Sequence, residues 1–212
     1  MRAANVLILL CVGASLYAWT ADPMIVEHDL AFSLQNLLDR RIWTVVTAIF
    51  VHANSVHLFG NMIFLYVFGN TLERVAGAKR MLSAFFLGGV LSFLLSLPFF
   101  PTGTTFLGAS AAIFTLTAVV MLIEPLRFSI LLLMPVGLVA VLYFLYNALS
   151  VYYNVQSNVA YVSHIIGFLI GTPMGMAWSP RWKRNLTISV GLLGAYFFLL
   201  FVIEAYVLPL LQ

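Results

Sequence analysis

Long apolar runs, separated by short polar or charged stretches, dominate this sequence. A helix needs about 20 mostly apolar residues to cross roughly 30 Å of hydrocarbon. Seven runs approach that length, and each predicts a membrane-spanning helix; they lie at about 4–20, 52–72, 80–98, 110–124, 127–149, 158–178 and 185–208. Residues 21–50 mix charged side chains with Leu, Phe, Ile and Trp, which favours helices on the membrane surface over a further span.

The composition agrees with this pattern and narrows the functions that it allows. Of the 212 residues, 63% are hydrophobic and 8% are charged, and the mean hydropathy is +1.05, far from the values of soluble domains. The sequence therefore predicts an all-α, polytopic membrane helical bundle. A single cysteine, Cys11, excludes a disulfide framework and a cysteine-rich metal site.

The basic residues predict the orientation of the bundle. With the N-terminus in the cytoplasm, eight of the ten basic residues lie inside, as the positive-inside rule requires, and only Arg40 and Arg41 lie outside. The inner residues are Arg2, Arg74, Lys79, Arg80, Arg127, Arg181, Lys183 and Arg184. Because this role accounts for the net charge of +3, nucleic acid is not expected as a partner. We expect a multi-pass protein of the cell membrane.

The first apolar run has a second interpretation. Residues 2–21, with Arg2, an apolar centre and AWTA before Asp22, also resemble a secretory signal peptide. Cleavage would remove the first span and leave the later topology unchanged, because the remaining loops carry the same charge bias.

The fourth span is too short to cross the membrane unaided. Its fifteen residues, from Ser110 to Glu124, cover only about 22 Å. Since Glu124, Pro125 and Arg127 mark its inner end, Ser110 should lie below the outer surface, and the preceding loop, residues 99–109, should dip into the membrane. Irregular backbone at that depth needs burial by protein or access to water. We therefore expect a hydrated cavity that opens outward, with Ser110 at its floor.

Three further polar side chains are predicted at the same depth. His57 and Asn61 share a helix face in the second span, and His164 lies about one and a half turns into the sixth. Polar groups inside spans are costly and indicate function by default. A histidine can take the proton of a serine nucleophile, and an amide, an imidazole N–H or backbone N–H groups can stabilise the oxyanion that forms. Because no acidic residue lies at this depth, the residues favour acyl transfer by a Ser-His dyad.

Four motifs, spread over residues 43–178, together resemble the rhomboid family of intramembrane serine proteases. They are HANSVHLFGN at 52–61, ERVAGAKR at 73–80, GAS at 108–110 and HIIGFLIG at 164–171. The resemblance implies Ser110 as nucleophile, His164 as general base, and His57, Asn61 and the Ser110 amide as the oxyanion hole. It further implies a six-helix catalytic core at 1–178, including the interfacial loop 21–50, followed at 179–212 by a basic inner loop and an additional transmembrane helix.

The resemblance also assigns supporting roles. It implies that His52 braces the site, and that Gly108, Gly167 and Gly171 let the serine and histidine helices pack closely. The sequence departs from the family at two positions: Thr44 follows Trp43 where many relatives have arginine, and Phe114 replaces a tyrosine that often stacks on the histidine. The implied activity is an intramembrane serine endopeptidase that cleaves transmembrane segments of membrane proteins near the outer face, without cofactor or metal.

Three other interpretations stay open at this point. The small residues around Ser110 can serve helix packing alone, as in a rhomboid-like protein that binds membrane helices without cleaving them. His52, His57 and His164 could hold a zinc ion, although Asn61 and Ser110 would then have no role. A conduction path is disfavoured, because the polar set has no counterpart in the inner half of the spans.

Overall fold

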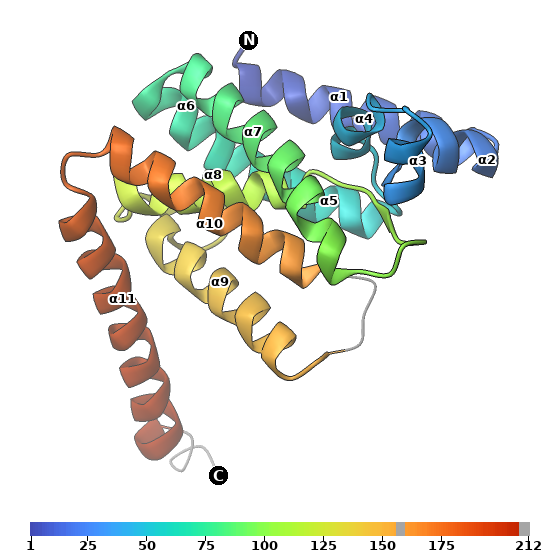
Figure 1. Ribbon diagram of the computed structural model, residues 1–212. Helices are drawn as coiled ribbons and strands as arrows, with labels where there is room; N and C mark the ends of the chain where they lie inside the picture. Colours follow the sequence, from blue (N-terminus) through green and yellow to red (C-terminus); the bar gives the residue numbers. More distant parts are fainter. Residues whose placement is uncertain (156–159, 208–212) are drawn as a thin grey trace.

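The apolar runs form helices in a computed structural model of the chain, which describes residues 1–155 and 160–207 (Figure 1). The all-α prediction is confirmed. The helices are α1 (Ala3–Thr20), α2 (Pro23–Ile25), α3 (Leu34–Leu38), α4 (Thr44–Phe50), α5 (Ser55–Phe64), α6 (Asn70–Ala76), α7 (Ala78–Ser96), α8 (Ser110–Ile123), α9 (Val136–Tyr152), α10 (Tyr161–Trp178) and α11 (Trp182–Val202). Short π or 3-10 segments are η1 (Val26–Leu30), η2 (Leu65–Gly69), η3 (Leu97–Phe99) and η4 (Ile203–Val207), and two-residue strands are β1 (Phe32–Ser33), β2 (Thr105–Phe106), β3 (Phe128–Ser129) and β4 (Met134–Pro135).

The helices that can cross a membrane by length and composition alone are fewer than the seven predicted spans. In the described part of the chain three qualify: Ala3–Thr20, Ala78–Phe99 and Trp182–Tyr206. A fourth is added if Thr44–Phe50 and Ser55–Ala76, which meet at 90°, are counted as one broken span. Helices α8 and α9 are apolar but shorter. The predicted start of the sixth span, at 158, and the predicted end of the seventh, at 208, lie outside the described residues.

The prediction that the fifth span begins at residue 127 was wrong. Strands β3 and β4 pair there as a small antiparallel hairpin, and α9 begins only at Val136. Pro135, with an extended backbone, stands directly before the helix, and Leu133 has a positive φ of 55°. Both conformations are incompatible with a helix, so residues 130–133 form the turn of the hairpin and Met134 lies in β4.

Helix α8 lies at the centre of the bundle. Every residue from Ala111 to Leu122 is buried, against α7 on one side and α10 on another. The contact with α10 is close because glycines face α8: a Cβ at Gly167 would overlap the carbonyl oxygen of Ala111, and one at Gly171 that of Thr115. The Thr115 hydroxyl donates to the Gly167 carbonyl at 2.8 Å. The short helix is thus enclosed by protein along almost its full length.

The irregular segment before α8 is held by the protein. β2 pairs antiparallel with β1, and Phe106 packs against the rings of Phe32, Phe93 and Phe100. Phe106 is only 3% exposed. The part of the segment next to α8 is therefore covered by protein, since Phe106, Gly108 and Ala109 are buried, whereas residues 101–103 are exposed.

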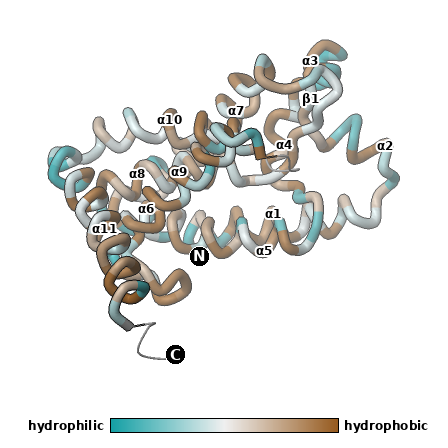
Figure 2. The backbone as a smooth tube through the Cα atoms, turned by 90° about the horizontal axis from the view of Figure 1, so that it is seen from below, coloured by the Kyte–Doolittle hydropathy of each residue, from teal (hydrophilic) through white to brown (hydrophobic). Residues whose placement is uncertain are grey.

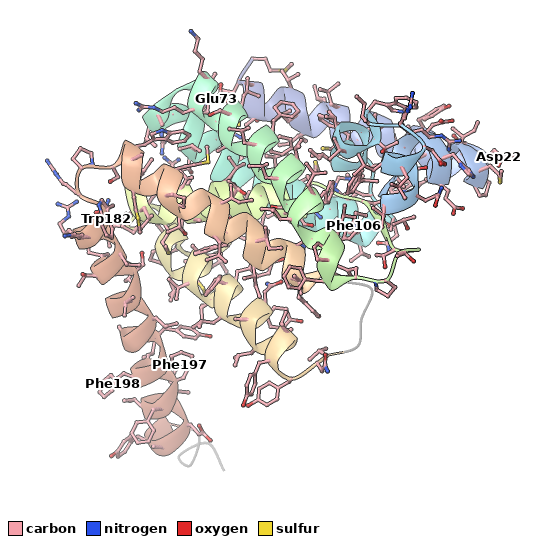
Figure 3. The ribbon with its side chains drawn as sticks, viewed as in Figure 1. Asp22, Glu73, Phe106, Trp182, Phe197 and Phe198 are labelled. Carbon is pink, nitrogen blue, oxygen red and sulfur yellow. The ribbon has the colours of Figure 1, made fainter. Side chains whose placement is uncertain are left out.

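Residues predicted on opposite sides of the membrane lie at opposite ends of the bundle. Figure 3 shows Glu73 and Trp182 at one end, and Asp22 and Phe106 toward the other. At the first end, the Glu73 carboxylate of α6 accepts hydrogen bonds from the first amides of α1, Ala3 and Ala4, at 2.9 and 2.8 Å. A carboxylate is favourable there because the N-terminus of a helix carries unpaired N–H groups.

Helix α11 stands apart from the other helices over most of its length (Figure 1), and its tube is mostly hydrophobic in Figure 2. Only 6% of the residues in its apolar 18-residue stretch are buried in the protein. Phe197 and Phe198 lie on the part that stands away from the bundle (Figure 3). Its buried residues are Asn185 and Ser189, near its first turns. The Asn185 amide donates to the last carbonyls of α8, at Leu122 and Ile123, which joins α11 to the helix of Ser110.

Candidate active site

Ser110 is the first residue of α8, and a sharply turned backbone presents it. Gly108, two residues earlier, has a φ of 111°, a conformation that favours glycine. Its amide donates to the Ala48 carbonyl of α4 at 2.8 Å, which fixes the loop. A Cβ at this position would come within 2.8 to 2.9 Å of the His57 ring, so glycine is required by space as well as by conformation.

His164 of α10 contacts Ser110 directly. Its Nε2 lies 2.8 Å from the serine Oγ, and the residue is only 6% exposed. Phe114, one turn after Ser110, stacks on the imidazole with 4.6 Å between ring centroids and 10° between planes. The missing tyrosine hydroxyl therefore leaves the ring contact in place. The close α8–α10 packing at Gly167 and Gly171 brings the two helices near enough for this pair to form.

The second imidazole nitrogen of His164 meets a residue that the sequence analysis did not select. Its Nδ1 lies 2.8 Å from Oδ1 of Asn147, on α9. Asn147 is 2% exposed, and its amide nitrogen donates to the Tyr143 carbonyl at 2.8 Å. The rule that polar residues within apolar spans indicate function would have found it, since Asn147 interrupts the run YFLYNALS.

His57 and Asn61 lie one turn apart on α5, as predicted. The His57 ring adjoins Gly108, whereas the Asn61 side-chain nitrogen donates to the His57 carbonyl at 2.8 Å. An asparagine amide has two N–H donors, so this bond leaves Asn61 one more. The structure thus places His57 beside the loop that leads to Ser110. Asn61 lies on the same face of α5 as His57.

His52 connects the N-terminal helix with this loop. Its Nε2 accepts the Ala109 amide at 3.3 Å, and its Nδ1 lies 3.1 Å from the Ser15 hydroxyl of α1. Trp19, also on α1, donates to the His52 carbonyl at 2.8 Å. Both ring nitrogens of His52, like those of His164, are therefore engaged within the protein. Neither Ser15 nor Trp19 was selected from the sequence.

This arrangement can move a proton away from a serine hydroxyl. Nδ1 of His164 faces an oxygen acceptor and so carries the proton, which leaves Nε2 free to accept the proton of Ser110. A serine beside an unprotonated imidazole nitrogen is the arrangement of an activated nucleophile.

Sequence comparison agrees with the geometry. The sequence model of the family described as "Rhomboid domain" matches residues 39–181, more than half of the chain. The chain belongs to the rhomboid family. Rhomboid proteins lie within membranes, and the apolar helices found here make this one a multi-pass membrane protein.

Individual relatives fall into two groups. The chain is 23% identical over 167 residues to the rhomboid protease GlpG of Haemophilus influenzae. This match covers 78% of this chain and 83% of that protein. It is 38% identical over 79 residues to Rhomboid-like protein 11, chloroplastic, of Arabidopsis thaliana, and 36% identical over 72 residues to Rhomboid-like protease 3 of Toxoplasma gondii. These matches cover 37% and 34% of this chain but only 28% and 27% of those two rhomboid relatives.

Proposed function

We propose that this rhomboid protein is an intramembrane serine endopeptidase in which Ser110 is the nucleophile and His164 the general base. The observation that carries the proposal is the 2.8 Å contact between Ser110 Oγ and His164 Nε2 at the N-terminus of a buried helix. Relatives named as proteases support the reaction class.

The reaction follows from this pair. Ser110 Oγ attacks the carbonyl carbon of a peptide bond while its proton passes to His164 Nε2, giving a tetrahedral oxyanion. When the C–N bond breaks, His164 returns the proton to the leaving amine, and an acyl-enzyme remains. Water, deprotonated by the same nitrogen, then hydrolyses the ester and restores the Ser110 hydroxyl.

His57, Asn61 and the Ser110 amide are proposed to stabilise the oxyanion. The N-terminus of α8 offers unpaired N–H groups and the positive end of a helix dipole. The His57 ring, on α5, adjoins Gly108 in the loop that precedes α8, and Asn61 retains a second N–H. His52 would brace the loop through its bond to the Ala109 amide.

The proposed substrates are transmembrane segments of membrane proteins, cut near the outer face of the cell membrane. In this proposal the N-terminus of the enzyme lies in the cytoplasm. A substrate helix must unwind locally, because its carbonyls are engaged in helical hydrogen bonds. Small or helix-breaking residues are therefore expected near the scissile bond.

We assign 1–178 to the catalytic core and 179–212 to a basic inner loop and an added helix. The family match ends at 181, beside the start of α11.

Labelling with a fluorophosphonate probe tests the nucleophile without knowledge of the substrate. We expect the purified protein in liposomes to be labelled at Ser110, and His164→Ala to lower the labelling rate by about 10³-fold or more, because the hydroxyl loses its base. Thr172→Ala, which removes a hydroxyl that donates only within α10, is the matched control and should label like the wild type. Folded wild-type protein that labels no faster than His164→Ala would instead favour the helix-binding alternative.

A further inference from the structure

We infer that Asn147 is a positioning residue that holds His164 in the tautomer with Nδ1 protonated, completing a Ser-His-Asn arrangement. The hydrogen-bond chain runs from the Tyr143 carbonyl through the Asn147 amide and the imidazole to the Ser110 hydroxyl. Its catalytic consequence rests on the proposed function, whereas its effect on the tautomer does not.

The donor and the acceptor of each hydrogen bond in this series follow from its first member, the Tyr143 carbonyl. The Tyr143 carbonyl can only accept, so the amide nitrogen of Asn147 must face it. The oxygen Oδ1 then faces His164, and Nδ1 must donate to it. A neutral imidazole has one N–H, so Nε2 is left as an acceptor for the Ser110 hydroxyl. A helix carbonyl thereby selects the tautomer that makes the serine a nucleophile.

Helix α9 also restrains the plane of the imidazole. Tyr143, one turn before Asn147, stacks on Phe114 with 4.7 Å between centroids and 15° between planes, and Phe114 stacks on His164. The ring of His164 is thus held at one edge by Asn147 and on one face by the Tyr143–Phe114 stack. Asn147, and Tyr143 behind the Phe114 ring of α8, come from neighbouring turns of α9.

An asparagine suits this buried position better than a carboxylate. Asn147 and His164 are 2% and 6% exposed, and an ionised carboxylate is costly in such surroundings. A neutral amide supplies the acceptor that Nδ1 needs, as the asparagine does in Cys-His-Asn proteases. The absence of an acidic residue at this depth therefore does not leave the histidine without an orienting group.

The tautomer can be measured directly by solid-state NMR of the protein labelled with 15N in its four histidines. The His164 signal, assigned by its loss in His164→Ala, is expected to show a protonated Nδ1 and an unprotonated Nε2 in the wild type. In Asn147→Leu, which has no acceptor, the Nε2-protonated form should become populated. A wild-type His164 with its proton on Nε2 would overturn the inference, whatever the variants do.

Kinetics on reconstituted protein provide the second readout. We expect Asn147→Leu to lower kcat for a cleaved substrate at least about tenfold, towards the 10⁴ that a wrong tautomer costs in a serine protease, with KM changed less than about twofold. Asn147→Asp keeps an acceptor at Nδ1 and should recover part of the lost kcat, but not all of it, because a buried carboxylate is costly and cannot donate to the Tyr143 carbonyl. Ser150→Ala, which removes a buried hydroxyl that donates to the Tyr146 carbonyl of the same helix, is the matched control.

The outcomes separate the two proposals. Equal kcat values for folded wild type, Asn147→Leu and Asn147→Asp would contradict a positioning role even if the enzyme is a protease. A wild type that cleaves nothing, with the expected tautomer in the NMR spectrum, would contradict the proposed function and leave the role of Asn147 in the tautomer intact.

Discussion

Helices α8 and α11 are both apolar over most of their length, yet they differ in which residues they bury. α8 buries every side chain from Ala111 to Leu122 inside the protein. α11 buries Asn185 and Ser189, while the large rings of Phe197, Phe198 and Phe201 are exposed by 54 to 68%. The difference arises because lipid replaces water as the solvent of α11, so that its polar residues need protein partners and its apolar ones do not.

This difference explains how a short helix can carry the proposed nucleophile. α8 has 14 residues and spans about 21 Å, too little for a membrane. Its last carbonyls accept from Asn185, and its N-terminal end follows a loop that is held by pairing with β1 and by the Gly108–Ala48 hydrogen bond. Other parts of the protein therefore contact both ends of α8. α11 is long enough to need no such help.

Truncating one buried and one exposed phenylalanine should separate the two helices most clearly. Phe114→Ala removes from α8 a ring that is 1% exposed, and we expect a loss of about 3 to 5 kcal/mol in the free energy of unfolding. Phe198→Ala, on α11, should change it by less than about 0.5 kcal/mol. Denaturation in mixed micelles measures both; equal losses would mean that α11 is buried against a partner.

A smaller difference is expected between two glycines. Gly171→Val places a side chain against the Thr115 carbonyl and should cost about 1 to 3 kcal/mol of unfolding free energy, lowering the probe-labelling rate as well, because α10 must move away from Ser110. Nothing lies within 4 Å of a Cβ at Gly191, so Gly191→Val on α11 is the control. If Gly171→Val keeps wild-type labelling, close packing of α8 and α10 is not what pairs serine with histidine.

The smallest effect concerns the polar contact between the two helices. Asn185→Ala leaves the last carbonyls of α8 without their donor and should cost about 1 kcal/mol, up to about 3 if no water reaches them. Thr187→Ala, an exposed position whose hydroxyl bonds only within α11, should leave stability unchanged. Losses of the same size in both variants would indicate that α11 is sensitive to substitution in general rather than joined to α8 through Asn185.

The sequence predicted the fold best where apolar runs end sharply. The predicted spans 4–20 and 110–124 agree closely with α1 and α8, because charged, proline or turn residues bound them. Hydropathy failed at 130–134, where apolar residues form a turn and the start of β4, with Leu133 at positive φ and Pro135 extended. It also could not distinguish α8 from α11, since both protein interior and lipid accept apolar side chains.

The same reasoning selected part of the site. Ser110, His164, His57 and Asn61 could be chosen because polar groups at one depth in different spans suggest a common site. Asn147 was passed over, since it belongs to no motif of the family resemblance and lies on the span whose start was misplaced. Ser15 was passed over because a serine in an apolar helix usually bonds to its own backbone; its bond to His52 depends on tertiary packing.

The most direct test of the account is cleavage by purified protein in liposomes that contain a panel of single-span test substrates, compared with Ser110→Ala. The account predicts that the wild type cuts at least one substrate near the outer end of its transmembrane helix, and that Ser110→Ala reduces this cleavage to background. Cleavage that persists in folded Ser110→Ala protein would contradict the assignment of Ser110 as the nucleophile.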